Sequence, residues 1–85
     1  MNMHEVRDTA QALAYITDCT LATVTDLASL ARPPKLELQR QIGIAQKAIE
    51  WMDNFNVDYS GTRAADVKAL GGSVEIWAAQ FTKKR

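Results

Sequence analysis

Two adjacent prolines, Pro33 and Pro34, divide this chain of 85 residues into two long segments. Proline lacks a backbone N–H and its ring clashes with the preceding helical turn, so a proline pair does not fit a helix interior. The residue before a proline is also driven out of helical geometry, which ends the first segment near residue 31. Pro34 suits the first turn of a second helix. The pair therefore predicts an antiparallel helical hairpin, about 3–31 and 35–54.

The segment before the prolines has apolar and small residues at alternating spacings of three and four. This spacing predicts one stripe along a helix, made of Met3, Val6, Ala10, Leu13, Thr17, Thr20, Val24, Leu27 and Ala31. Its weak point is residues 15–25, which are rich in β-branched side chains that favour strands. One long helix is the preferred interpretation. The alternatives are two helices, divided at Asp18 or Thr25, and a short strand.

Residues 35–54 have the clearest amphipathic pattern in the chain. Two neighbouring apolar stripes together cover about half of the helix circumference at about 100° per residue. The first stripe consists of Leu38, Ile42, Ala45, Ile49 and Met52, and the second of Ile44, Ala48, Trp51 and Phe55. Such a wide apolar face needs two partners. One is the first helix, and the other is either the C-terminal part of the chain or a second molecule.

The rest of the chain predicts a turn and two short helices. Residues 54–62 are rich in Asn, Asp, Ser and Gly, which favour turns. Thr62 is placed to cap a short helix that the glycine pair at 71–72 would end. Ser73 is placed to cap the last helix, whose apolar residues share one face: Val74, Trp77, Ala78 and Phe81. A strand over residues 74–77 is the alternative.

These patterns predict one all-α domain spanning residues 1–85. Its fold is a small helical bundle built on the long hairpin, with one or two short C-terminal helices. The hydrophobic fraction is 47%, but 13 of these residues are alanine, which favours helix and adds little buried area. Because so short a chain has a thin core, association with a second copy would be a natural way to stabilise it.

Ten basic and ten acidic residues cancel, so the formal net charge is zero. Nucleic-acid binders usually have a positive balance because phosphate neutralisation supplies much of their affinity. Nucleic acid is therefore a disfavoured partner, although a local basic patch keeps it open. No apolar stretch approaches the roughly 20 residues of a membrane span, and the N-terminus does not resemble a signal peptide. A cytoplasmic location without membrane contact is expected.

No group of residues has the spacing of a catalytic, cofactor or metal site, so we expect no cofactor and no enzyme activity. On a continuous helix, His4 and Cys19 lie more than roughly 20 Å apart, and Cys19 is expected to be a small packed residue. In residues 54–61, oxygen-bearing side chains occur at alternate positions, as they do in calcium-binding loops. However, Tyr59 stands where a glycine is needed and Ala65 where a bidentate glutamate is needed. Residues 60–63 could hold an anion at a helix start, but a simple helix start is preferred.

The leading functional hypothesis is a non-enzymatic protein–protein interaction module: a small regulator, adaptor or inhibitor of another protein, and possibly in the form of a homodimer. Its basis is the surplus of apolar surface on residues 38–55. The candidate partner-binding residues are Ile44, Ala48, Trp51, Phe55 and Trp77. Tryptophan is enriched in the centres of interfaces, but in so small a domain it is also common in the core. Both placements stay open for each tryptophan.

Two other hypotheses remain. Residues 24–31 and the helix after the prolines could form a helix-turn-helix DNA-binding regulator, with these residues facing DNA: Arg32, Lys35, Gln39, Arg40, Gln46 and Lys47. The proline pair at the turn and the neutral charge argue against it. The third hypothesis is a small phage- or plasmid-encoded accessory protein that inhibits a host protein, and it rests on chain size alone.

Overall fold

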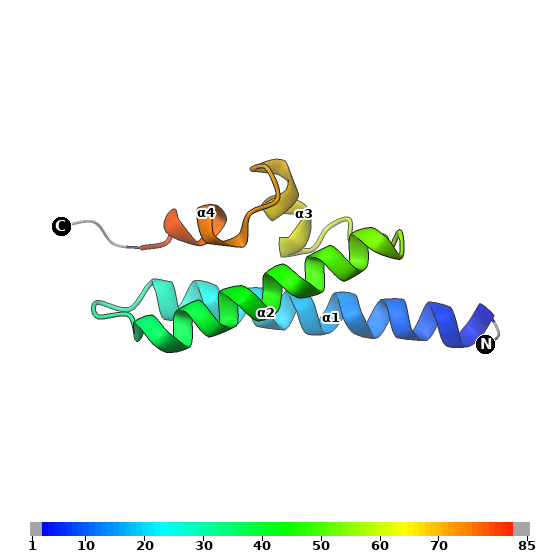
Figure 1. Cartoon of the computed structure of the whole chain (residues 1–85), viewed down its shortest axis with the longest axis horizontal. Coiled ribbons are helices and arrows are strands. Elements are labelled where there is room, and N and C mark those ends of the chain that lie inside the picture. The colour runs from blue at the N-terminus through cyan, green and yellow to red at the C-terminus, as the bar shows by residue number, and fades with distance from the viewer. Residues whose placement is uncertain (1–2, 83–85) are drawn as a thin grey trace.

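The computed structural model describes the backbone of residues 3–82 and the side chains of residues 9–82. Within this range the chain forms four helices and no strand: α1 (Met3–Ala28), α2 (Lys35–Asn54), α3 (Arg63–Ala69) and α4 (Val74–Ala79). α1 and α2 run side by side in opposite directions, and α3 and α4 lie along one side of this pair (Figure 1). The all-α bundle predicted on an antiparallel hairpin is confirmed. None of the described helices combines the length and hydropathy that crossing a bilayer demands.

α1 is one continuous helix through the threonine-rich stretch, so the two-helix and strand alternatives are wrong. Four threonine hydroxyls each donate to the carbonyl oxygen four residues earlier, at 2.6 to 3.1 Å: Thr17, Thr20, Thr23 and Thr25. These bonds satisfy the hydroxyls within the helix itself. They matter most for Thr17, which is fully buried. The packing of α1 against the other three helices thus overrides the low helix propensity of this stretch.

The core-facing stripe of α1 is rotated relative to the predicted one. Val24 is buried as predicted, but Leu21 and Ala28 continue the buried stripe in place of Thr20 and Leu27. α1 packs against α3 and α4 as well as α2, and these additional neighbours turn the buried stripe toward their side. A spacing of three and four fits both registers equally well, so the sequence could not choose between them.

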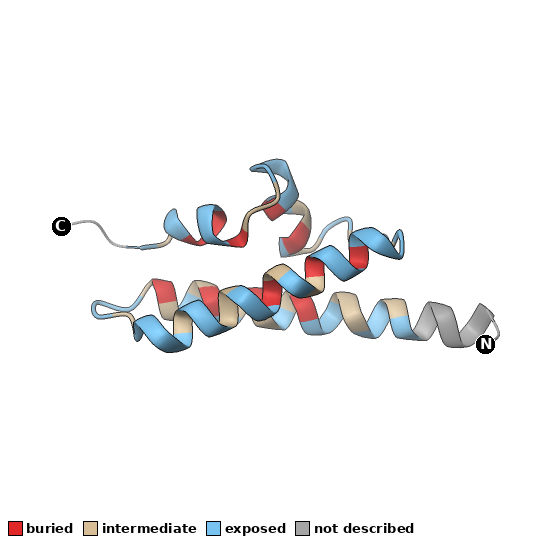
Figure 2. Ribbon diagram, viewed as in Figure 1, coloured by how far each residue is buried: buried red, intermediate tan, exposed pale blue. Residues whose placement is uncertain are grey.

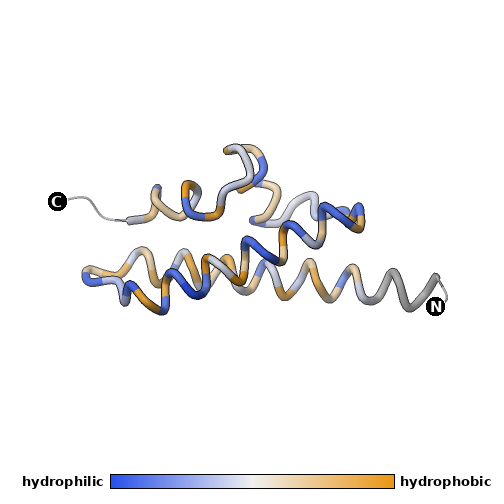
Figure 3. The backbone as a smooth tube through the Cα atoms, in the orientation of Figure 1, coloured by the Kyte–Doolittle hydropathy of each residue, from blue (hydrophilic) through white to orange (hydrophobic). Residues whose placement is uncertain are grey.

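The core lies where α1 and α2 meet the two short helices, and Figure 2 shows buried positions in all four helices. Its buried residues are Leu21, Val24, Ala45, Ile49, Met52, Ala64, Val67, Val74, Trp77 and Ala78. The first apolar stripe of α2 therefore faces the core as predicted, with Leu38 and Ile42 partly buried beside it. Along α2 the colouring of Figure 3 alternates between hydrophobic and hydrophilic, as two apolar stripes interrupted by polar residues require.

α2 ends in a hydrogen-bonded turn that closes its last carbonyl groups. Asn56 has a φ of 54°, in the left-handed region, and the N–H of Val57 donates to the carbonyl oxygen of Met52 at 2.9 Å. This is the arrangement in which a left-handed residue reverses the chain after a helix. The glycine pair at 71–72 ends α3 in the same way, as predicted.

α3 is capped by a residue from α1. Thr62 occupies the N-cap position as predicted, but its hydroxyl donates to the carbonyl oxygen of Tyr59 at 2.6 Å and makes no capping hydrogen bond. Instead, one carboxylate oxygen of Asp18 accepts from the backbone N–H of Arg63 at 2.9 Å, and the other accepts from its guanidinium at 2.8 Å. The positive end of a helix favours such an anion. The chain itself supplies the anion at this helix start.

Gln46 of α2 holds the loop between α3 and α4. Its amide nitrogen donates to the carbonyl oxygen of Gly72 at 3.0 Å, and its amide oxygen accepts from the N–H of Val74 at 2.8 Å. Ser73 caps α4 as predicted, because its hydroxyl oxygen accepts from the N–H of Ile76 at 3.3 Å. Gln46 therefore fixes where α4 begins relative to α2.

Candidate functional site

The second apolar stripe of α2 stays at the surface. Ile44, Trp51 and Phe55 are 45%, 53% and 67% exposed, and Ala48 is half-buried. α3 and α4 pack on the other side of the hairpin, where Gln46 contacts their loop. Within residues 9–82 no segment covers this stripe. The C-terminal helices thus pack against the first stripe of α2, and α1 only borders the second stripe.

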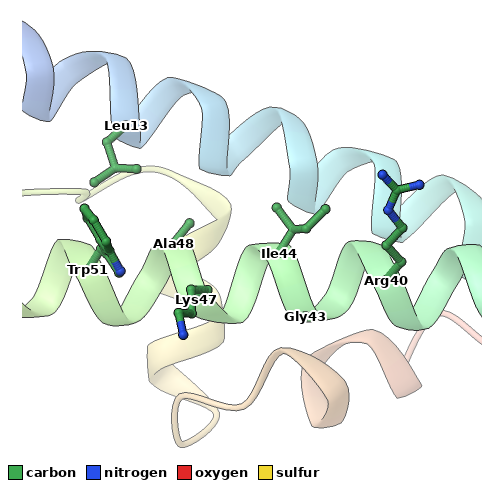
Figure 4. Close-up of a pocket in the computed structure, with 7 residues that line it drawn as sticks. All are labelled: Leu13, Arg40, Gly43, Ile44, Lys47, Ala48 and Trp51. Atoms are coloured by element: carbon green, nitrogen blue, oxygen red, sulfur yellow. The ribbon is translucent and has the colours of Figure 1, made fainter.

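α1 and α2 form a shallow groove along the exposed stripe, with a volume of about 540 Å³. Its lining residues, drawn in Figure 4, are Leu13, Arg40, Gly43, Ile44, Lys47, Ala48 and Trp51. Leu13 approaches Trp51 from α1, while Ile44 and Ala48 point from α2 toward α1 (Figure 4). The rings of Trp51 and Phe55 lie edge to face, with centroids 5.9 Å apart. We call this feature the Trp51 groove.

Two cationic side chains flank the Trp51 groove. Arg40 lies at one end, and Lys47 projects on the side away from α1 (Figure 4). Arg40 has one weak contact, at 3.8 Å, with the exposed carboxylate of Glu37. Among the ion pairs of the described residues, none involves Lys47. Among the residues whose side chains the structure describes, no acidic one lines the groove, so its described border is positively charged.

Trp77 lies in the core. It is 3% exposed, and its ring packs edge to face on Phe81 with centroids 4.9 Å apart. It is therefore not available to a partner in this fold, and the candidate surface loses one of its five predicted residues. The sequence left both placements open for Trp51 and Trp77 because each lies on an apolar helix stripe. The packing of α4 buries Trp77 and leaves Trp51 exposed.

Sequence reasoning missed Leu13, Arg40 and Lys47 as residues of the groove. Leu13 was assigned to the core-facing stripe of the first helix, and the structure shows that it lies at the edge of that stripe and is partly buried. From the sequence, Arg40 and Lys47 were considered only as residues that would face DNA. The i, i+7 spacing of Arg40 and Lys47 shows that they lie near one edge of α2. It does not show that a groove adjoins that edge.

The residues of the helix-turn-helix hypothesis have other surroundings in this structure. Residues 24–28 form the last turn of the 26-residue α1, which runs beside α2 in the opposite direction. Gln46 is bound to the loop between α3 and α4, while Arg40 and Lys47 flank the Trp51 groove. DNA binding stays a prediction, and salt-dependent retention on DNA would test it.

A polar cluster at the end of α2 holds the following turn. The carboxylate of Asp53 accepts from the hydroxyl of Tyr59 at 2.6 Å and from the ammonium of Lys68 at 3.0 Å. These two bonds lower the pKa of Asp53, with the Tyr59 bond as the larger cause. Burial, followed by the bond to Asp53, raises the pKa of Tyr59 to about 12. The cluster ties the turn to α3, which is a structural role.

Two further sequence expectations concern titratable or metal-binding side chains. Cys19 is exposed, so the prediction that it is packed is wrong. It follows the buried Thr17 by two residues, about 200° around the helix, which turns it away from the core. The side chain of His4 lies outside the described residues. In the described part of the chain, no three or more His, Cys, Asp or Glu residues gather as a metal site would require.

Comparison of the chain with protein-family models, curated proteins and solved structures gives no match. The candidate site is therefore defined by its geometry: an exposed aromatic pair beside an apolar groove with a basic border. Four of the predicted partner-binding residues share this face, namely Ile44, Ala48, Trp51 and Phe55.

Proposed function

We propose that this chain is a non-enzymatic protein–protein interaction module that binds another protein in the Trp51 groove. The observation on which the proposal depends is the exposed, edge-to-face pair of Trp51 and Phe55 beside the groove. Aromatic side chains of this size supply much of the binding energy at the centres of interfaces. A small regulator, adaptor or inhibitor of a cytoplasmic protein would use such a surface.

The position of the exposed stripe supports a binding role over a role in folding. The buried residues of α2 are Ala45, Ile49 and Met52, and none of them belongs to the second stripe. Apolar side chains that lie together at a surface and have a polar border are typical of interaction sites. Leu36, by contrast, is an isolated apolar residue of α2, 85% exposed and outside the groove.

Affinity capture with matched variants tests this proposal. The full chain, Trp51→Ala and Leu36→Ala are immobilised and exposed to lysate of the native host, and the captured proteins are quantified by mass spectrometry. We expect at least one protein that the full chain and Leu36→Ala retain equally and that Trp51→Ala loses. That protein is then purified, and its direct binding to the three chains is measured by calorimetry.

The result that would overturn the proposal is capture and direct binding that do not differ between Trp51→Ala and the full chain. Circular dichroism of the three chains provides the folding control. Because both replaced side chains are exposed, their helix content is expected to be equal.

A homodimer is the alternative in which a second copy occupies the same groove. Light scattering after size-exclusion chromatography distinguishes the two cases. A dimer at tens of micromolar that Trp51→Ala converts to a monomer would favour self-association over a separate partner.

A further inference from the structure

We draw no further inference here: the strongest candidate, the Trp51 groove between α1 and α2, belongs to the site already described, and nothing in the part of the chain that the structure describes shows what covers it.

Discussion

Asn56 is the residue on which the end of α2 depends. It is the one non-glycine residue with positive φ among those described, at 54°, and the turn that it makes brings Val57 back against the core. Most L-residues lose about 1–2 kcal/mol in this left-handed conformation, whereas glycine adopts it freely and asparagine tolerates it. The identity of this side chain is therefore fixed by backbone geometry.

We predict that Asn56→Ala lowers the free energy of unfolding by about 1 kcal/mol, because alanine is strained in the left-handed region. Asn56→Gly serves as the matched variant and should be neutral or slightly stabilising. Urea denaturation followed by circular dichroism measures both. Equal stability of the two variants would mean that Asn56 does not hold a left-handed conformation in solution.

The pKa of Tyr59 can be used to monitor the structure of the turn after α2. Burial and the bond to Asp53 raise its pKa to about 12, compared with about 10 for an unperturbed tyrosine. A group with a raised pKa in the folded state contributes its stability fully below the unfolded pKa and loses it as the pH rises through the folded one. The stability that Tyr59 contributes should therefore be lost between about pH 10 and 12.

A Tyr15→Phe variant leaves Tyr59 as the only tyrosine, since the chain has two. We predict that the phenolate absorbance of this variant appears with a midpoint near 12, because burial and the hydrogen bond to Asp53 raise the pKa of Tyr59 to about 12. Asp53→Asn in the same background should lower the midpoint, because it removes the charge that opposes ionisation. A midpoint near about 10 with full helix content would contradict the partly buried, hydrogen-bonded position of Tyr59.

Asp53 accepts the hydrogen bond from Tyr59, and its ionisation determines how this bond responds to low pH. Its pKa is lowered, chiefly by the hydrogen bond from Tyr59 and then by Lys68. A lowered pKa contributes stability above the unfolded value, and this stability is lost as the pH falls through the folded value. The Tyr59–Asp53 bond thus supports the fold across the neutral range and weakens at both extremes of pH.

The short helices α3 and α4 depend on long-range hydrogen bonds for their position. They have seven and six residues, which is below the length at which isolated helices are stable in water. Gln46 binds two backbone groups of their connecting loop, and Asp18 caps the start of α3. We therefore expect these two helices to be the part of the fold most sensitive to a single polar substitution.

We predict that Gln46→Ala lowers the free energy of unfolding by about 1–3 kcal/mol, since it removes both partners of the loop. Amide hydrogen exchange should accelerate in α3 and α4 more than in the α1–α2 hairpin. Gln39→Ala is the control, because Gln39 is exposed on the same helix and makes no side-chain hydrogen bond among the described residues. Uniform exchange in all four helices after Gln46→Ala would argue that the short helices do not open separately.

For the molecule as a whole, the two tryptophans have opposite roles, one in stability and the other in the proposed binding. Trp77 is 3% exposed and Trp51 is 53% exposed. We predict that Trp77→Ala costs about 3–5 kcal/mol of stability, because it leaves a cavity in a thin core. Trp51→Ala should cost less than about 1 kcal/mol and should instead abolish partner capture. Thermal unfolding of the two variants provides the comparison, and similar losses in both would mean that Trp51 is part of the core in solution.

The helices, their breaks and the first apolar stripe of α2 could be predicted from the sequence, because each depends on neighbours within a few turns. Pro33 and Pro34 set the hairpin turn, the glycine pair at 71–72 ends α3, and Ser73 caps α4. Helical periodicity and capping are local properties, so they can be recognised without knowing what packs against the helix.

The tertiary structure decided which apolar surface is covered. Either stripe of α2 could have received the C-terminal helices, and either tryptophan could have been buried. The choice depends on contacts between residues far apart in the chain, such as Gln46 with Val74 and Asp18 with Arg63, which are 28 and 45 positions apart. The spacing of apolar residues along a helix shows which of them share a face. It does not show which part of the chain packs against that face. The Trp51 groove therefore exists because α3 and α4 pack on the other side of the hairpin.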